Sequence, residues 1–177
     1  LFVGLPLDRD CTESCPRSGK VEMYRRAPDG FEFVRDIRPS NTEPALFGAS
    51  LAFDGERLAV GAPEESAVYI YSVDDAEVVL EERIPHEGIN SEFGFSISLE
   101  GDLLAIGAPS ENNSATGIDT EAFDTSCVQG DRGPGAVFLY EGPTPWRQAV
   151  YIKADARLAA MQLSLPGPAG ADGLMKF

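Results

Sequence analysis

The chain carries one histidine and three cysteines, which are the residues that could supply nucleophilic, acid-base or zinc chemistry. His86, in the stretch Pro85-His86-Glu87, is the one imidazole that a Ser-His-Asp or Cys-His arrangement could use. The sequence has no Gly-x-Ser-x-Gly elbow and no glycine-rich phosphate loop. We therefore predict that the protein is not an enzyme and that His86 lies in a surface loop.

The cysteines are separated unequally along the chain. Cys11 and Cys15 lie four residues apart in one loop-like stretch, and Cys127 lies in another. A disulfide between Cys11 and Cys15 is sterically feasible in a loop and would fit an oxidising compartment, with Cys127 free or paired outside the chain. Three reduced thiols are the alternative. A zinc site is disfavoured because it would need more Cys or His at suitable spacing.

The composition describes a globular and strongly acidic protein. Of the 177 residues 43% are hydrophobic, and 29 Asp and Glu against 14 Lys and Arg give a net charge of −15. This charge would repel a phosphate backbone or an anionic membrane surface, so nucleic acid is not an expected partner. No stretch approaches the roughly 18 to 20 consecutive apolar residues of a membrane span, so no span is expected.

The strongest feature of the sequence is an internal repeat. Phe47-Gly48 precedes Gly61-Ala62-Pro63 in one copy, and Phe93-Gly94 precedes Gly107-Ala108-Pro109 in the next, with an offset of 46 residues throughout. An aromatic run follows each Gly-Ala-Pro, at residues 67–71 and 136–140. Residues 1–6 and 19–24 repeat the same two elements, so we expect the chain to begin inside a repeat.

Each copy has the pattern of short antiparallel strands. Alternating apolar residues on both sides of the turn Asp54-Gly55 predict a first and a second strand. Runs of β-branched and aromatic residues predict a third strand over 67–72 and 136–141, and a fourth over 78–84 and 148–154. No segment has a sustained helical period. We therefore predict an all-β fold of about three four-stranded antiparallel units, arranged radially as propeller blades.

The repeated residues are expected to serve packing. Glycine permits close approach of two backbones or a positive φ, and proline ends strand pairing because it cannot donate to a ladder. The phenylalanine of each Phe-Gly pair would fill the gap between neighbouring blades. Trp146 and Tyr151, near the start of a fourth strand, are also predicted to be packing residues.

These motifs resemble the FG-GAP repeat of integrin α-subunit head propellers and of many secreted bacterial proteins, and the long insertion at 110–134 is similar to the microbial version. The resemblance implies an incomplete set of the blades of a larger propeller that lies outside the cytoplasm, in an extracellular, cell-surface or periplasmic location. It also implies partners that are proteins or glycans. Three blades cannot close a ring, so further blades from the same or another chain are expected to cover the apolar faces.

The resemblance divides the chain into four parts. Residues 1–40 would form a partial blade with strands two to four, residues 41–87 one FG-GAP blade, and residues 88–154 a second with the long loop 110–134. Residues 155–177 would be either a degenerate start of the next blade or a Gly/Pro-rich tail. Met161-Gln162 stands where the next Phe-Gly pair is expected.

Integrin-type repeats often carry a calcium loop after Gly-Ala-Pro, in which oxygen ligands converge from a tight turn. The first loop offers Asp8, Asp10, Thr12 and Glu13, without the turn glycine and the final carboxylate of that pattern. The last loop offers Asp119, Asp124 and Asp131 at irregular spacing. The resemblance thus makes calcium a candidate cofactor at these two loops, with plain solvated loops as the alternative.

The function expected from these features is that of a noncatalytic binding or adhesion module. Its partners would contact the long loops 7–18 and 110–134, which both follow a second strand. A purely structural subunit of a surface assembly and a hydrolase on a propeller scaffold are the alternatives. Asn112, in Asn112-Asn113-Ser114, is an acceptor for N-glycosylation if the protein is eukaryotic.

Overall fold

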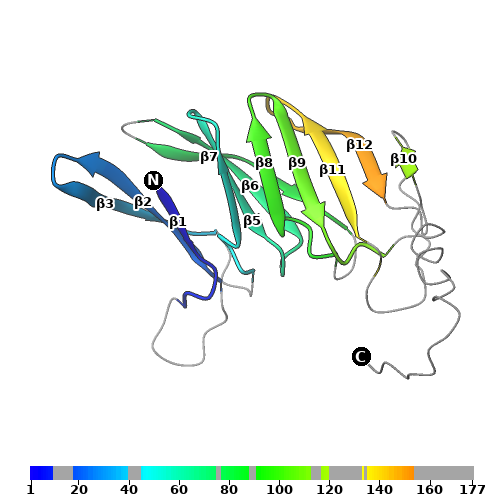
Figure 1. The fold of residues 1–177 in the computed structure, drawn as a ribbon, viewed down its shortest axis with the longest axis horizontal. Coiled ribbons are helices and arrows are strands. Elements are labelled where there is room, and N and C mark those ends of the chain that lie inside the picture. The colour runs from blue at the N-terminus through cyan, green and yellow to red at the C-terminus, as the bar shows by residue number, and fades with distance from the viewer. Residues whose placement is uncertain are drawn as a thin grey trace, which may run out of the picture.

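The computed structural model describes residues 1–9, 18–39, 45–74, 77–87, 91–112, 117–119, 133 and 135–153. These residues form three antiparallel β-sheets that follow one another along the molecule (Figure 1). The predicted all-β antiparallel fold is therefore confirmed. Among the described residues, no helix is long and apolar enough to cross a membrane.

The first sheet contains β1 (Phe2–Leu5), β2 (Lys20–Ala27) and β3 (Gly30–Ile37) in that order. The second contains β4 (Ser50–Phe53), β5 (Arg57–Ala62), β6 (Ala67–Val73) and β7 (Val78–Pro85), also in chain order. The third contains β8 (Ser96–Glu100), β9 (Leu103–Ala108), β11 (Ala136–Glu141) and β12 (Arg147–Lys153), with β10 (Gly117–Asp119) added beside β12. The predicted third and fourth strands match β6, β7, β11 and β12 closely.

The third sheet departs from the predicted number of four strands. Its fifth strand, β10, comes from inside the insertion 110–134 and pairs with the end of β12. With three residues, Gly117-Ile118-Asp119, it is too short to show an alternating pattern. Its position depends on pairing with an edge that lies far away in the sequence.

The three sheets repeat the same register. In each sheet a glycine pairs with a valine on the neighbouring strand, and this valine pairs with an isoleucine on the strand beyond it. The three rows are Gly4–Val21–Ile37, Gly61–Val68–Ile84 and Gly107–Val137–Ile152. Each sheet also has an irregularity in its outer ladder immediately before a tyrosine, at Tyr24, Tyr71 and Tyr140. The repeat read from the sequence is therefore a repeat of hydrogen-bond register.

Two hydrophobic cores lie between neighbouring sheets, and a phenylalanine of the repeat is buried in each. Phe47 lies between the first and second sheets, 5.3 Å from Tyr69 and 6.3 Å from Tyr71 between ring centroids. Phe93 lies between the second and third sheets, 5.3 Å from Phe138 and 6.3 Å from Tyr140. All four ring pairs meet edge to face, the arrangement that aromatic quadrupoles favour. Each phenylalanine thus fills the space between two sheets.

Trp146 and Tyr151 are buried in the second of these cores, as predicted. The backbone N–H of Trp146 donates to the Glu82 carboxylate of the second sheet at 2.9 Å. The guanidinium of Arg57, also in the second sheet, lies 5.9 Å from the Trp146 ring and forms a 3.0 Å ion pair with Asp102 of the third. These contacts join the two sheets at the edge that carries the tight hairpins.

At the opposite edge, glycines of neighbouring sheets lie in close contact. A Cβ atom on Gly61 would overlap the carbonyl oxygen of Gly94, and a Cβ on Gly4 would overlap that of Gly48. Gly48 and Gly94 have φ values of 89° and 91°, a conformation that disfavours any other residue. Glycine is therefore required on both sides of each contact.

We predict that Gly61→Ala strongly destabilises the protein and that Gly107→Ala has a much smaller effect. At both positions a Cβ would meet a serine hydroxyl, of Ser50 or Ser96, but only at Gly61 would it also meet the backbone of the next sheet. A backbone clash is expected to cost about 3 kcal/mol of unfolding free energy. Urea denaturation of the two variants measures the difference, and equal losses would show that inter-sheet contact is not the cause.

We also predict that stability falls as the pH rises from about 10 to about 12. Burial raises the pKa of Tyr140 to about 12, and burial together with the Glu65 carboxylate raises that of Tyr69 to about 12. In the unfolded chain these hydroxyls ionise near pH 10. The unfolded state therefore loses its protons first and is favoured as the pH rises through this range.

Replacing Tyr140 with Phe should reduce this loss of stability, because the buried hydroxyl is removed. The measurement is urea denaturation of wild-type protein and of the Tyr140→Phe variant at several pH values between neutrality and 12. An unchanged pH profile in the variant would contradict the assignment to Tyr140.

Candidate functional site

The candidate site is the edge of the sheets from which the two long loops leave. β1, β5 and β9 end there at equivalent positions, and each continues into a proline, Pro6, Pro63 or Pro109. The same turn follows each time, with the N–H of Asp8, Glu65 and Glu111 donating to Leu5, Ala62 and Ala108 at 3.1, 3.1 and 3.2 Å. The turn places a carboxylate two residues after each proline.

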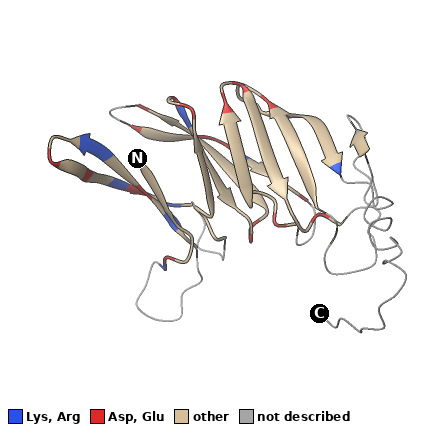
Figure 2. Ribbon diagram, in the orientation of Figure 1, with Lys and Arg blue, Asp and Glu red and all other residues tan. Residues whose placement is uncertain are grey.

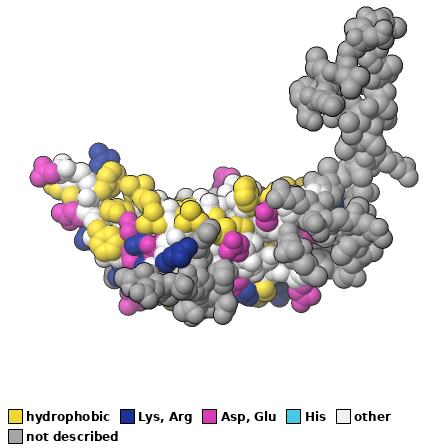
Figure 3. Space-filling view, turned by 90° about the horizontal axis from the view of Figure 1, so that it is seen from below, with side chains coloured by type: hydrophobic (Ala, Val, Ile, Leu, Met, Phe, Trp, Pro, Cys, Tyr) yellow, Lys and Arg dark blue, Asp and Glu magenta, His cyan; other side chains and the backbone are white. Residues whose placement is uncertain are grey.

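Each of these carboxylates contacts a basic side chain. Asp8 lies 2.9 Å from the Arg38 guanidinium, Glu65 lies 2.7 Å from that of Arg83, and Glu111 lies 2.8 Å from the His86 imidazole. Figure 3, seen toward this edge, shows acidic and basic side chains next to one another. In the second and third sheets, many of the acidic residues lie at strand ends and turns, and most residues within the strands are uncharged (Figure 2).

Glu65 has the most elaborate set of partners. Its carboxylate accepts hydrogen bonds from the Tyr69 hydroxyl at 2.8 Å and from Nε of Arg83 at 2.8 Å. The Arg83 guanidinium also lies 5.9 Å from the centre of the Tyr69 ring. The carboxylate therefore anchors β6 and β7 to the turn after Pro63.

His86 and Glu111 form a pair that joins the second and third sheets. Nε2 of His86 and Oε2 of Glu111 are 2.8 Å apart, and each side chain is 3% exposed. The imidazole is stacked on Phe93 with a centroid distance of 4.9 Å and lies 4.8 Å from Phe138. The prediction of a surface-loop histidine is therefore wrong, because the loop after β7 places this ring against the core of the next sheet.

The structure describes only part of the predicted metal and disulfide residues. Asp8 is paired with Arg38, so a guanidinium already balances its charge. Asp119 lies in β10. The described residues contain no group of three His, Cys, Asp or Glu side chains that could hold a metal ion. The other predicted residues lie outside the described part of the chain: Asp10, Thr12, Glu13, Asp124, Asp131, Cys11, Cys15 and Cys127.

Asn112, the predicted glycosylation acceptor, directly follows Glu111 and is partly buried. The next two residues of its acceptor pattern lie outside the described residues. Calcium binding, the disulfide and glycosylation stay predictions.

The carboxylate two residues after each proline is not among the residues predicted from the sequence. The signal was present in Pro6-Leu7-Asp8, Pro63-Glu64-Glu65 and Pro109-Ser110-Glu111, which extend the repeat by two positions. From the sequence, Asp8 is predicted only as a metal ligand, and Glu65 is given no role. Comparing all three copies at this position would have indicated a structural role.

A comparison with protein-family models gives no match, and a comparison with curated protein sequences gives none either. A relation to FG-GAP repeats therefore stays a prediction from the sequence. It depends on the two Phe-Gly pairs and the two Gly-Ala-Pro runs.

We predict that Glu111→Gln lowers the unfolding free energy by about 2 kcal/mol, because a neutral amide replaces the buried carboxylate that is hydrogen-bonded to the His86 ring. The matched control is Asp102→Asn, which breaks the pair with Arg57 at a position where the acidic side chain is 61% exposed. Breaking an exposed pair should cost less than about 1 kcal/mol. Urea denaturation at neutral pH compares the two, and similar losses would argue against a structural role for the buried pair.

Proposed function

We propose that this chain is a noncatalytic binding module of the FG-GAP propeller type that acts outside the cytoplasm. Its partners, proteins or glycans, would contact loops 7–18 and 110–134. The observation that carries this proposal is the placement of the two loops. They leave the first and third sheets at the same edge, after strands that end at the equivalent residues Leu5 and Ala108.

The repeated packing supports the propeller interpretation. Sheets of the same register stack side by side, with a buried phenylalanine and a pair of close glycines at each of the two junctions. Such a stack grows by adding units in one direction, as blades do. No unit needs a different kind of contact to join the next.

The surroundings of His86, Asp8 and Glu65 support a noncatalytic role. The only imidazole of the chain is covered by Phe93 and Phe138 and bound to Glu111, so it is not accessible to a substrate. The carboxylates of Asp8 and Glu65 are held by arginines. These groups stabilise the edge from which the loops leave, and the loops supply the surface for binding.

Trimming the loops tests this proposal. Residues 10–17 and 120–132 are replaced, separately and together, by short Gly-Ser linkers, which leaves β10 in place. Binding is then measured on a glycan array and a panel of immobilised extracellular proteins, with and without calcium. We expect binding by the intact chain and its loss in the trimmed variants, while the circular dichroism spectrum stays unchanged.

The control variant changes the hairpin turn at Asp54-Gly55 on the opposite edge to Asn-Gly, which keeps the turn type. It should bind like wild type. Absence of any partner for the intact chain, or full binding after both loops are trimmed, would count against the proposal. Loss of binding only when calcium is removed would assign the cation to the loops.

A second candidate function is that of a structural subunit in a surface assembly. It is favoured by one observation, the apolar face of the third sheet, where Val137 and Phe95 are exposed. Under this alternative the trimmed variants would still assemble. Light scattering of intact and trimmed protein distinguishes the two functions.

A further inference from the structure

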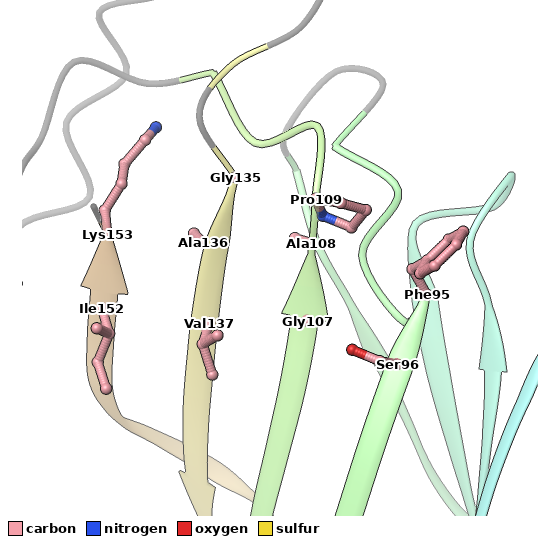
Figure 4. A pocket seen from close by; sticks show the side chains of 10 residues that line it. All are labelled: Phe95, Ser96, Gly107, Ala108, Pro109, Gly135, Ala136, Val137, Ile152 and Lys153. Carbon is pink, nitrogen blue, oxygen red and sulfur yellow. The ribbon is translucent and has the colours of Figure 1, made fainter. Parts of the chain in front are cut away.

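The third sheet has a groove on the face that points away from the second sheet. The groove has a volume of about 520 Å³ and crosses the ends of β8, β9, β11 and β12. Gly107, Val137, Ile152 and Ser96 line it (Figure 4). Gly107, Val137 and Ile152 form the same row as Gly61–Val68–Ile84 in the second sheet and Gly4–Val21–Ile37 in the first.

This row is covered in the first two sheets and open in the third. Val21 and Val68 are each 0% exposed, whereas Val137 is 40% exposed. Ile37 and Ile84 are also buried, whereas Ile152 is only partly buried. The three rows have the same residue types in the same register, and their exposure differs because a neighbouring segment covers the first two rows.

A Phe-Gly pair covers the row in both internal examples. Gly48 lies over the first sheet, where a Cβ would come within 2.7 Å of the Lys20 carbonyl oxygen and 3.2 Å of Val21 Cγ2. Gly94 lies over the second, where the corresponding distances to Ala67 O and Val68 Cγ2 are 2.8 and 3.2 Å. The equivalent atoms of the third sheet belong to Ala136 and Val137, and no described Phe-Gly pair lies on them.

A serine beside the row adds a polar contact. Ser50 of β4 donates from its hydroxyl to the carbonyl oxygen of Gly94 at 2.7 Å, across the junction between the second and third sheets. Ser96 of β8 holds the equivalent position next to Gly107 and lines the groove. Its hydroxyl is placed to donate to the carbonyl of an incoming glycine.

We propose that this groove binds a strand-forming peptide segment that begins with Phe-Gly, with its glycine at positive φ against Ala136 and Val137. The two Phe-Gly pairs of a second copy of this chain are themselves buried and do not supply it. At the corresponding position of its own sequence the chain has Met161-Gln162, and glutamine carries the Cβ that such a site excludes. The occupant is therefore a segment of another unit of this repeat type.

Docking of this segment rests on the second candidate function, that of a structural subunit in a surface assembly. It adds which segment an assembly partner must present. It requires neither long loop. A chain with both loops trimmed should therefore bind the segment as well as the intact chain does, and this separates failure of the groove from failure of the loop proposal.

The probe is a fluorescein-labelled peptide with the sequence of residues 91–100, Ser-Glu-Phe-Gly-Phe-Ser-Ile-Ser-Leu-Glu. Binding to the intact chain is followed by fluorescence anisotropy. We expect saturable binding, and binding at least about tenfold weaker for a peptide in which the glycine after phenylalanine is alanine, since a loss of 1.4 kcal/mol corresponds to a factor of ten. No saturable binding, or equal binding of the two peptides, would overturn the proposal.

Protein variants locate the peptide in the groove. Val137→Asp should weaken binding about tenfold or more, because it places a carboxylate beneath the incoming segment. Its matched control is Val79→Asp, at an exposed strand valine of the second sheet, which should bind like wild type. A milder variant is Ser96→Ala, which should weaken binding several-fold. Its control is Ser98→Ala on the same strand, which should leave binding unchanged. Equal behaviour within both pairs would place the peptide elsewhere and overturn the assignment.

Discussion

The close contact between two glycine backbones is the constraint on which the arrangement of the sheets depends. Gly61 of one sheet lies against the carbonyl of Gly94, and Gly4 against that of Gly48, with no room for a side chain. The N–H groups of Gly48 and Gly94 in turn donate to the carbonyls of Gly61 and Gly107 at 3.0 and 3.2 Å. Each Phe-Gly pair is therefore hydrogen-bonded to its own sheet and packed on the preceding one, which fixes the spacing at which phenylalanine fills the junction.

Carboxylates bound to basic side chains hold the loop-bearing edge in a chain that has a net charge of −15. Asp8, Glu65 and Glu111 are each bound to a basic side chain, and their burial rises in that order. Removing such charges from water is costly unless they are paired, so the partners and the carboxylates are needed together. The remaining acidic side chains at turns of the second and third sheets face solvent, where they favour solubility and discourage association between strand edges.

Strands and junctions could be predicted from the sequence because their determinants are local or repeated. The turn Asp54-Gly55 and the alternating residues around it predict β4 and β5, and the offset of 46 residues transfers this prediction to β8 and β9. Burial of His86 and the addition of β10 could not be predicted in this way. Both depend on contacts with segments farther along the chain: Phe93 and Phe138 for the imidazole, and the end of β12 for the added strand. No hydrophobic periodicity near His86 or β10 indicates these contacts.

The outer faces of the first and third sheets differ in chemistry, and this difference decides which face needs a specific partner. On the outer face of the first sheet, Lys20 and Glu22 stand where the second sheet has Ala67 and Tyr69, and their side chains form a 2.7 Å ion pair. Although Leu1 and Val3 beside them are exposed, the centre of that face is ionic and tolerates water. The open face of the third sheet instead presents Val137 and Ile152 beside a glycine backbone. Solvation of apolar side chains there is unfavourable, so that face gains most from a partner that fits it.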